Sequence, residues 1–178
     1  VGSEMCIRDR PSGIGPDLII QLCSSNFWKQ IKLPICCIAD PTLLQDRAEK
    51  LGKKIKLVQI DNLKDLQSNI RNEIQIIKIA KCPITKHGKL YRSNAKYVLE
   101  NLNFGISAAL EDKKLGLVTG PISKENIISI DKTFSGHTEH IQKLTKSKDV
   151  LMLLGSDKLK VALATTHIPL KAVPKKIT

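Results

Sequence analysis

Short, mostly apolar runs rich in β-branched residues and leucine alternate along this chain with longer segments in which apolar residues recur every three or four positions. Runs of the first kind are typical of buried strands, and segments of the second kind are typical of amphipathic helices. The clearest helical pattern begins at Ser93 and ends at Leu110. We expect strands over residues 34–39, 55–60, 74–79, 115–119, 150–154 and 161–166. Strands that alternate with helices in this way predict the α/β class with a mostly parallel sheet.

The composition is that of a globular domain of medium size. The chain has 178 residues, of which 42% are hydrophobic, so it can bury a sizeable core. No apolar run approaches the roughly 20 residues that cross a bilayer. The first residues also lack the basic region and apolar core of a signal peptide. We therefore expect a cytoplasmic protein with no membrane partner.

The five cysteines are odd in number and include no C-x-x-C pair, which argues against a disulfide framework and a zinc ribbon. The formal net charge is +12, so binding to nucleic acid has to be weighed. The lysines are scattered, however, and only 3% of residues are aromatic, which leaves few platforms for stacking bases. A lysine-rich solvated surface with a mild preference for phosphorylated substrates is the better interpretation, and we expect no nucleic-acid partner.

The first ten residues differ from the rest of the chain. Val1 to Arg10 show neither helical nor strand periodicity and resemble read-through of a sequencing adapter. We interpret residues 1–10 as a non-native scar and exclude them from the fold prediction. Pro11 to Asp17 follow, with a Gly-x-Gly pattern ahead of a helix start. These glycines can cradle an anion with free backbone N–H groups, or they can only make a tight turn between a strand and a helix.

A histidine ends the last predicted strand. The run from Val161 to Thr166 carries no charge and suits the middle of a covered sheet. Pro169 cannot donate to a strand ladder, so regular pairing should stop close to it. His167 would then lie at the carboxyl end of the strand, where open α/β sheets bind their ligands. A purely structural histidine is the alternative that this pattern leaves open.

A second polar cluster spans Ser135 to His140. Gly136 permits close approach of a ligand, and His137 and Thr138 are adjacent hydrogen-bonding groups that suit a carboxylate, a hydroxyl or a phosphate. An ordinary helix cap is the alternative. A metal pair of His137 with His140 would lack its remaining ligands. We interpret the other histidine, His87, as solvated in a surface turn.

Four motifs together resemble one family. They are Pro-Ser-Gly-Ile-Gly-Pro-Asp (residues 11–17), Leu-Val-Thr-Gly-Pro-Ile-Ser-Lys (117–124), Ser-Gly-His-Thr-Glu (135–139) and Val-Ala-Leu-Ala-Thr-Thr-His-Ile-Pro-Leu (161–170). Their order and spacing are similar to those of 4-hydroxythreonine-4-phosphate dehydrogenases, which act in pyridoxal phosphate biosynthesis. The resemblance covers Pro11 to the end of the chain. It implies the isocitrate/isopropylmalate dehydrogenase-like α/β fold, with a mixed sheet and flanking helices.

The resemblance also implies a chemistry and residue roles. The family oxidises 4-phosphohydroxy-L-threonine with NAD, and the resulting β-keto acid loses CO2 to give 3-amino-2-oxopropyl phosphate. A divalent cation (zinc, magnesium or cobalt) assists, because it lowers the pKa of the substrate hydroxyl and polarises the ketone. By resemblance, His137 and Thr138 contact the substrate and His167 binds the metal. Lys124 is a candidate for the substrate phosphate or carboxylate, with a solvated lysine at a helix start as the alternative.

The chain also departs from the family. Family members are about twice as long, and they begin with a strand where this chain has Val1 to Arg10. Their other metal-binding histidines and most NAD contacts lie in the second half, and they form homodimers with active sites across the interface. They usually carry a bulky apolar residue at the position of His140. We therefore expect residues 11–178 to be an inactive amino-terminal fragment, truncated before the rest of the site.

Two alternatives remain open from the sequence. The first is a dehydrogenase of another four-carbon phosphorylated acid, such as erythronate 4-phosphate or threonate 4-phosphate. The second belongs to a different class and is a basic nucleic-acid-binding module, which would bind generic DNA in a salt-sensitive manner.

Overall fold

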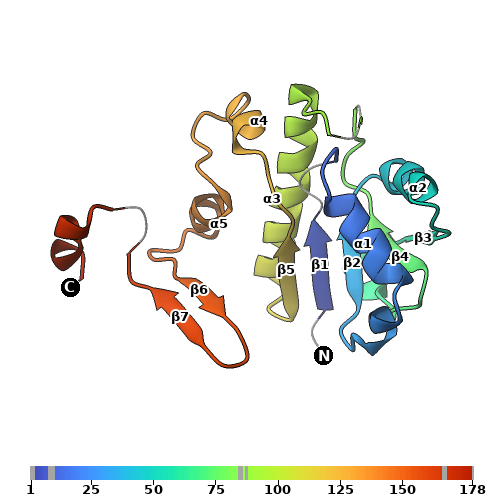
Figure 1. Cartoon of the computed structure of the whole chain (residues 1–178), viewed down its shortest axis with the longest axis horizontal. Helices are drawn as coiled ribbons and strands as arrows, with labels where there is room; N and C mark the ends of the chain where they lie inside the picture. The colour runs from blue at the N-terminus through green and yellow to red at the C-terminus, as the bar shows by residue number, and fades with distance from the viewer. Residues whose placement is uncertain (1–2, 8–10, 84–85, 87, 166–167, 178) are drawn as a thin grey trace. The chain divides into compact units, whose positions relative to one another are not determined.

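The computed structural model describes residues 3–7, 11–83, 86, 88–165 and 168–177. The chain forms two compact units, Val1–Ser135 and Gly136–Thr178, and we describe each by itself (Figure 1). Across the described residues, no helix is both long enough and apolar enough to cross a membrane.

A five-stranded parallel sheet forms the centre of the first unit. Its strands stand in the order β3-β4-β2-β1-β5, and every neighbouring pair is parallel. Their bounds are β1 Ser3–Ile7, β2 Ile35–Ile38, β3 Lys56–Gln59, β4 Glu73–Ile77 and β5 Leu115–Thr119. The predicted α/β class with a parallel sheet is therefore confirmed for this unit.

Strand β1 lies inside this sheet, between β2 and the edge strand β5, although the sequence pattern predicted no strand there. Cys6 pairs with Cys37 of β2 on one side and with Val118 of β5 on the other. Local pattern failed here because two flanking strands provide backbone partners on both sides, and such context overrides weak strand propensity. That residues 1–10 are non-native stays a prediction.

Helices cover both faces of the sheet. Helix α1 (Gly15–Ser24) lies in front of the sheet in Figure 1, and α3 (Ala95–Glu111) lies behind β5 and β1, against which it packs. Helix α2 (Pro41–Lys50) packs beside α1, and α4 (Lys124–Ile128) follows β5. Three short 3-10 turns complete the unit: η1 Asn26–Gln30, η2 Leu63–Asp65 and η3 Arg92–Asn94.

The core on the α1–α2 side follows from residue spacing. Alternate residues of β2 and β4 point to one face, and they meet the apolar sides of the two helices. This buried cluster includes Ile19, Cys23, Cys37, Leu44, Ala48, Ile74 and Ile76. The side chains of Arg47 and Asp17 form an ion pair that joins α2 to the first turn of α1.

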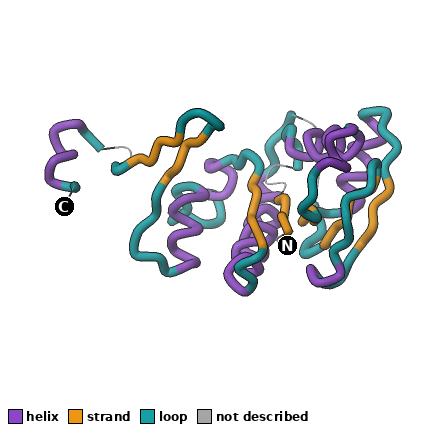
Figure 2. The backbone as a smooth tube through the Cα atoms, turned by 90° about the horizontal axis from the view of Figure 1, so that it is seen from below, coloured by secondary structure: helices purple, strands orange, loops and turns teal. Residues whose placement is uncertain are grey.

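The second unit is smaller and holds helix α5 (His137–Thr145), a hairpin of β6 (Met152–Gly155) and β7 (Lys160–Leu163), and the turn η4 (Leu170–Lys175). Figure 2 shows the two hairpin strands side by side. A strand is confirmed over Val161 to Leu163, but the prediction that it is buried in a covered sheet was wrong, and Thr166 lies outside the described residues. Among the described residues the strand pairs with β6 alone, antiparallel, and Val161 is 41% exposed. The reason is the tight turn in which Ser156 N donates to Leu159 O at 2.7 Å, because it folds the run back on β6.

A buried carboxylate links three segments of the first unit. Asp40 follows β2 and is 2% exposed. Its Oδ1 accepts a hydrogen bond from Thr42 N (3.0 Å), which caps α2, and its Oδ2 accepts one from Cys82 N (2.8 Å). Its own backbone N–H donates to the Tyr97 hydroxyl of α3 at 2.9 Å. These bonds fix the end of β2, the start of α2, the loop after β4 and α3 relative to one another.

We predict that Asp40→Ala lowers the free energy of unfolding by about 2 kcal/mol, because it removes the cap of α2 and the acceptor of two part-buried backbone hydrogen bonds. Urea denaturation measures the change. Asp112→Ala is the matched control, since exposed Asp112 also accepts a backbone N–H, from Lys114 at 2.9 Å. The control should cost less than about 1 kcal/mol. Equal losses in the two variants would contradict the role given to Asp40.

Candidate functional site

The carboxyl ends of the parallel strands meet at one edge of the sheet, where open α/β folds bind ligands. The chain from residue 78 to residue 92, here called the edge segment, crosses this edge after β4. It is held at Asp40 by Cys82 N, and Gly88 N donates to Ser12 O at 3.0 Å. Asn126 of α4 donates to Tyr91 O, also at 3.0 Å. The loops that follow β1, β2 and β5 are therefore all bonded to the edge segment.

Lys124 lies at this edge. It is the first residue of α4, five positions after the end of β5 at Thr119. Its side chain is exposed and forms no ion pair among the described residues. Ser123 holds the N-cap position but makes no side-chain cap hydrogen bond. The exposed ammonium group of Lys124 could bind an anion at this edge. Its position therefore fits both interpretations made from the sequence, a contact to the substrate phosphate or carboxylate and a solvated lysine at a helix start.

Sequence reasoning missed a polar group near the N-cap of α4. Ser12 is 8% exposed, and its hydroxyl has no hydrogen-bond partner among the described residues. It lines a small hollow together with Ser123, Asn126 and Lys89. The Pro11–Asp17 motif contained the residue, but its burial depends on the distant loop at Gly88, which no local pattern encodes.

The Gly-x-Gly motif lies at the start of α1, and a charged residue close to it indicates which of its two possible roles is favoured. Asp17 lies in the first turn of α1, and its carboxylate pairs with Arg47. An acidic group in the first turn already complements the partial positive charge of the helix end. This arrangement favours a turn between a strand and a helix over an anion cradle.

In the second unit, His137 and Thr138 form the first turn of α5. Both are half-buried, and the N-cap residue Gly136 has no side chain with which to cap the helix. His140 N closes the turn by donating to Gly136 O at 3.1 Å, and its side chain is buried. Two adjacent polar side chains at an uncapped helix start can hold an anionic or hydroxyl-bearing group.

The predicted metal ligand His167 lies outside the described residues, as does His87. Within the part of the chain that the structure describes, no group of three or more histidine, cysteine, aspartate or glutamate side chains is placed to hold a metal ion. The described residues therefore do not fit a complete metal centre, and we derive no step through a metal from them. Lys124 belongs to the first unit, and the His137–Thr138 pair belongs to the second.

Comparison with known proteins gives consistent matches. The family model described as "Pyridoxal phosphate biosynthetic protein PdxA" matches residues 30–178. A curated 4-hydroxythreonine-4-phosphate dehydrogenase from Erwinia tasmaniensis is 36% identical over 168 residues, which are 94% of this chain and 50% of that protein. The chain thus spans about half the length of this relative.

Solved structures share the fold. A 4-hydroxythreonine-4-phosphate dehydrogenase from Klebsiella pneumoniae superimposes with a TM-score of 0.83 at 23% identity, covering 96% of this chain and 53% of its own. The enzyme of the same name from Burkholderia phymatum gives a TM-score of 0.81 at 20% identity, covering 95% of this chain and 51% of its own. At these identities the likeness concerns the fold alone.

The buried Tyr97 hydroxyl, which supports this edge, makes stability depend on pH. Burial raises the pKa of Tyr97 well above its ordinary value. The unfolded state releases this proton near pH 10, whereas the folded state keeps it, so unfolding is favoured as pH rises above about 10.

We predict that the wild-type protein loses free energy of unfolding above pH 10 more steeply than Tyr97→Phe, by up to about 1.4 kcal/mol per pH unit. At pH 7 the variant should be less stable by about 1 kcal/mol, because Asp40 N loses its acceptor. Denaturation curves between pH 7 and 11 measure both effects. If the free energy of unfolding of the two proteins changed with pH in parallel, Tyr97 would not be buried in its protonated form.

Proposed function

The chain belongs to the family of the pyridoxal phosphate biosynthetic protein PdxA, and on this basis we propose that it is part of a 4-hydroxythreonine-4-phosphate dehydrogenase. The observation that carries the proposal is the 36% identity over 94% of the chain to a relative of that name. The reaction transfers a hydride from the carbinol carbon of 4-phosphohydroxy-L-threonine to NAD and releases the hydroxyl proton. The β-keto acid then loses CO2, gains a proton and leaves 3-amino-2-oxopropyl phosphate.

We assign the fold to the isocitrate/isopropylmalate dehydrogenase type. The parallel sheet with helices on both faces supports this assignment. A homodimer in the cytoplasm, with phosphorylated small molecules as substrates, is the corresponding expectation for the full-length protein.

In this proposal His137 and Thr138 bind the substrate from the first turn of α5. Their half-buried positions and the absence of a side-chain cap at Gly136 support the role. Lys124 binds the substrate phosphate or carboxylate as an exposed cation at the carboxyl edge of the sheet. Each of these residues would act as a substrate contact, with NAD as the hydride acceptor.

His167 is the proposed metal ligand of this chain. A divalent cation, when bound, would supply Lewis-acid polarisation of the substrate oxygen. One imidazole cannot hold such an ion tightly, so the remaining ligands would come from outside residues 1–178.

The test is an NADH absorbance assay of the full-length protein with a divalent metal. We expect turnover of 4-phosphohydroxy-L-threonine, with 3-amino-2-oxopropyl phosphate identified by mass spectrometry. Preferred turnover of erythronate 4-phosphate or threonate 4-phosphate would replace the proposed substrate. The separate chain 1–178 should show no NAD reduction under the same conditions, and measurable turnover by it would refute the divided site.

We predict that Thr138→Val lowers kcat/KM of the full-length enzyme by roughly 10- to 100-fold, the cost of one hydrogen bond to a charged substrate group. Thr138→Ser, which keeps the hydroxyl, is the matched control and should stay within about threefold of wild type. Lys124→Gln should raise KM by a similar factor, whereas Lys132→Gln, at another exposed position, should not. If Val and Ser at position 138 behave alike, Thr138 does not contact the substrate.

A further inference from the structure

The edge segment is strongly cationic. Between Glu73 and Glu100 the chain contains no acidic residue, although it contains six basic ones. These are Lys78, Lys81, Lys86, Lys89, Arg92 and Lys96. All six side chains are exposed. In this part of the chain the basic residues are therefore not interspersed with acidic ones.

Most of these cations lack an acidic partner. Lys96 pairs with Glu100 at 3.7 Å, and Arg92 lines a surface hollow with Glu125. The other four lysines form no ion pair among the described residues. Two acidic groups near the edge are already engaged, because Asp40 accepts two backbone N–H groups and Asp17 pairs with Arg47. Asp61 after β3 and Glu125 of α4 are exposed at the same edge and are the acidic groups that face these cations.

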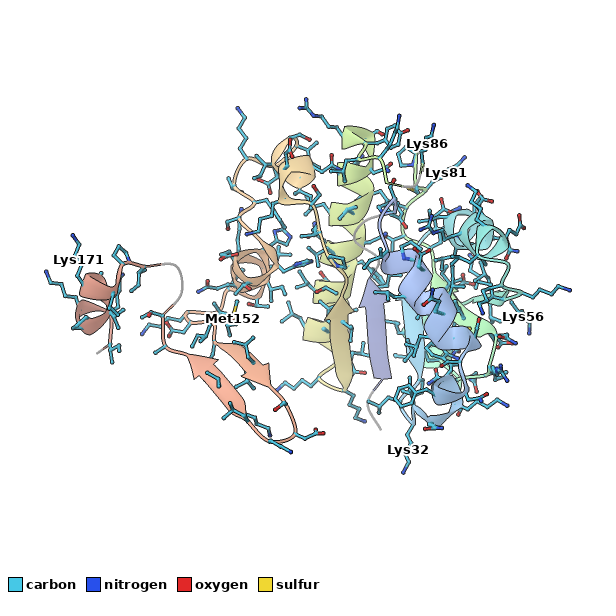
Figure 3. All side chains as sticks on the ribbon, in the orientation of Figure 1. Lys32, Lys56, Lys81, Lys86, Met152 and Lys171 are labelled. Carbon is cyan, nitrogen blue, oxygen red and sulfur yellow. The ribbon has the colours of Figure 1, made fainter. Side chains whose placement is uncertain are left out.

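The hydrogen bonds of the edge segment hold these charges at the ligand-binding edge. Its bonds to Asp40, Ser12 and Asn126 follow β2, β1 and β5 in the order in which those strands stand in the sheet. In Figure 3, Lys81 and Lys86 lie at this end of the first unit, and Lys32, which precedes β2, lies at the opposite end.

We propose that Lys78, Lys81, Lys86 and Lys89 form an electrostatic guide that attracts small phosphorylated anions to the carboxyl edge of the sheet. The identity of the anion as a phosphorylated substrate rests on the proposed function. Clustered charge of one sign raises the association rate of an oppositely charged ligand by about 10- to 1,000-fold at low ionic strength. The effect fades with salt, since the Debye length falls from about 30 Å at 0.01 M to about 3 Å at 1 M.

A small anion fits this surface better than a single-stranded nucleic acid does. Proteins that bind single strands without sequence preference stack the bases on aromatic side chains between the cations. The only aromatic residue of the edge segment is Tyr91, which is half-buried, and the nearby Tyr97 is 2% exposed. The segment therefore offers charge with almost no exposed stacking surface.

The experiment compares two fourfold variants of the full-length protein. The first replaces Lys78, Lys81, Lys86 and Lys89 with glutamine. The matched control replaces four lysines that precede strands at the opposite edge, Lys29, Lys32, Lys113 and Lys114, which are also exposed. Both variants lose the same charge, and both should keep the wild-type urea midpoint.

Two readouts separate this inference from the proposed function. The affinity for inorganic pyrophosphate is measured by calorimetry, and kcat/KM for the phosphorylated substrate by NADH absorbance, both from 10 mM to 0.5 M salt. At 10 mM salt we expect the first variant to lose about tenfold in both quantities, and at 0.5 M salt the loss should disappear. The control variant should remain within about twofold of wild type.

The remaining outcomes are each decisive. Loss of pyrophosphate affinity without any substrate turnover would support the guide and refute the proposed dehydrogenase. Normal turnover with identical behaviour of the two variants would overturn the guide and leave the dehydrogenase intact. Loss of duplex DNA binding with unchanged pyrophosphate affinity would overturn the guide in favour of a nucleic-acid surface.

Discussion

The buried carboxylate of Asp40 is the interaction on which the candidate edge depends. Removing a carboxylate from water costs several kcal/mol unless hydrogen bonds replace the lost hydration. Asp40 meets this requirement with two backbone N–H donors, one from its own helix start and one from Cys82, 42 positions along the chain. Because both donors belong to the backbone, the carboxylate fixes main-chain positions of the edge segment as well as the cap of α2.

The parallel sheet sets where the polar groups gather. Its interior is apolar and includes residues such as Ile38 and Ile76. The carboxyl ends of all five strands share one edge, so the polar loops that follow them lie together there. Lys124 at the start of α4 and the edge segment after β4 are both consequences of that topology.

The sequence predicted much of this fold, because most of the first unit is encoded locally. Strands β2 to β5 lie within mostly apolar runs, the motif of residues 11–17 leads into α1 as predicted, and α3 has the predicted helical spacing. The comparisons confirm the family resemblance, which rested on four separated motifs. The start of α3 was predicted at Ser93 but lies at Ala95, because residues 92–94 form a 3-10 turn.

Features that depend on distant partners were not predictable in this way. Strand β1 has no pattern of its own and is defined by the strands on either side of it. The orphan hydroxyl of Ser12 is buried by a loop 76 positions away, and β7 was misjudged because an apolar run does not reveal which strand it pairs with. Local periodicity reports which face of a segment is buried, but it carries no information on what buries that face.

The proposed guide and a hydrogen bond to a ligand would act at different ranges. A hydrogen bond acts only on a ligand already in place, because it weakens within a few ångströms. The cations of the edge segment act over about a Debye length, roughly 8 Å at physiological ionic strength. Four of them form no ion pair among the described residues. Their positive charge is therefore not neutralised by an internal partner and can attract an anion from solution. The topology therefore places these four lysines at the carboxyl edge, whereas other exposed lysines, such as Lys32 and Lys113, lie at the opposite edge.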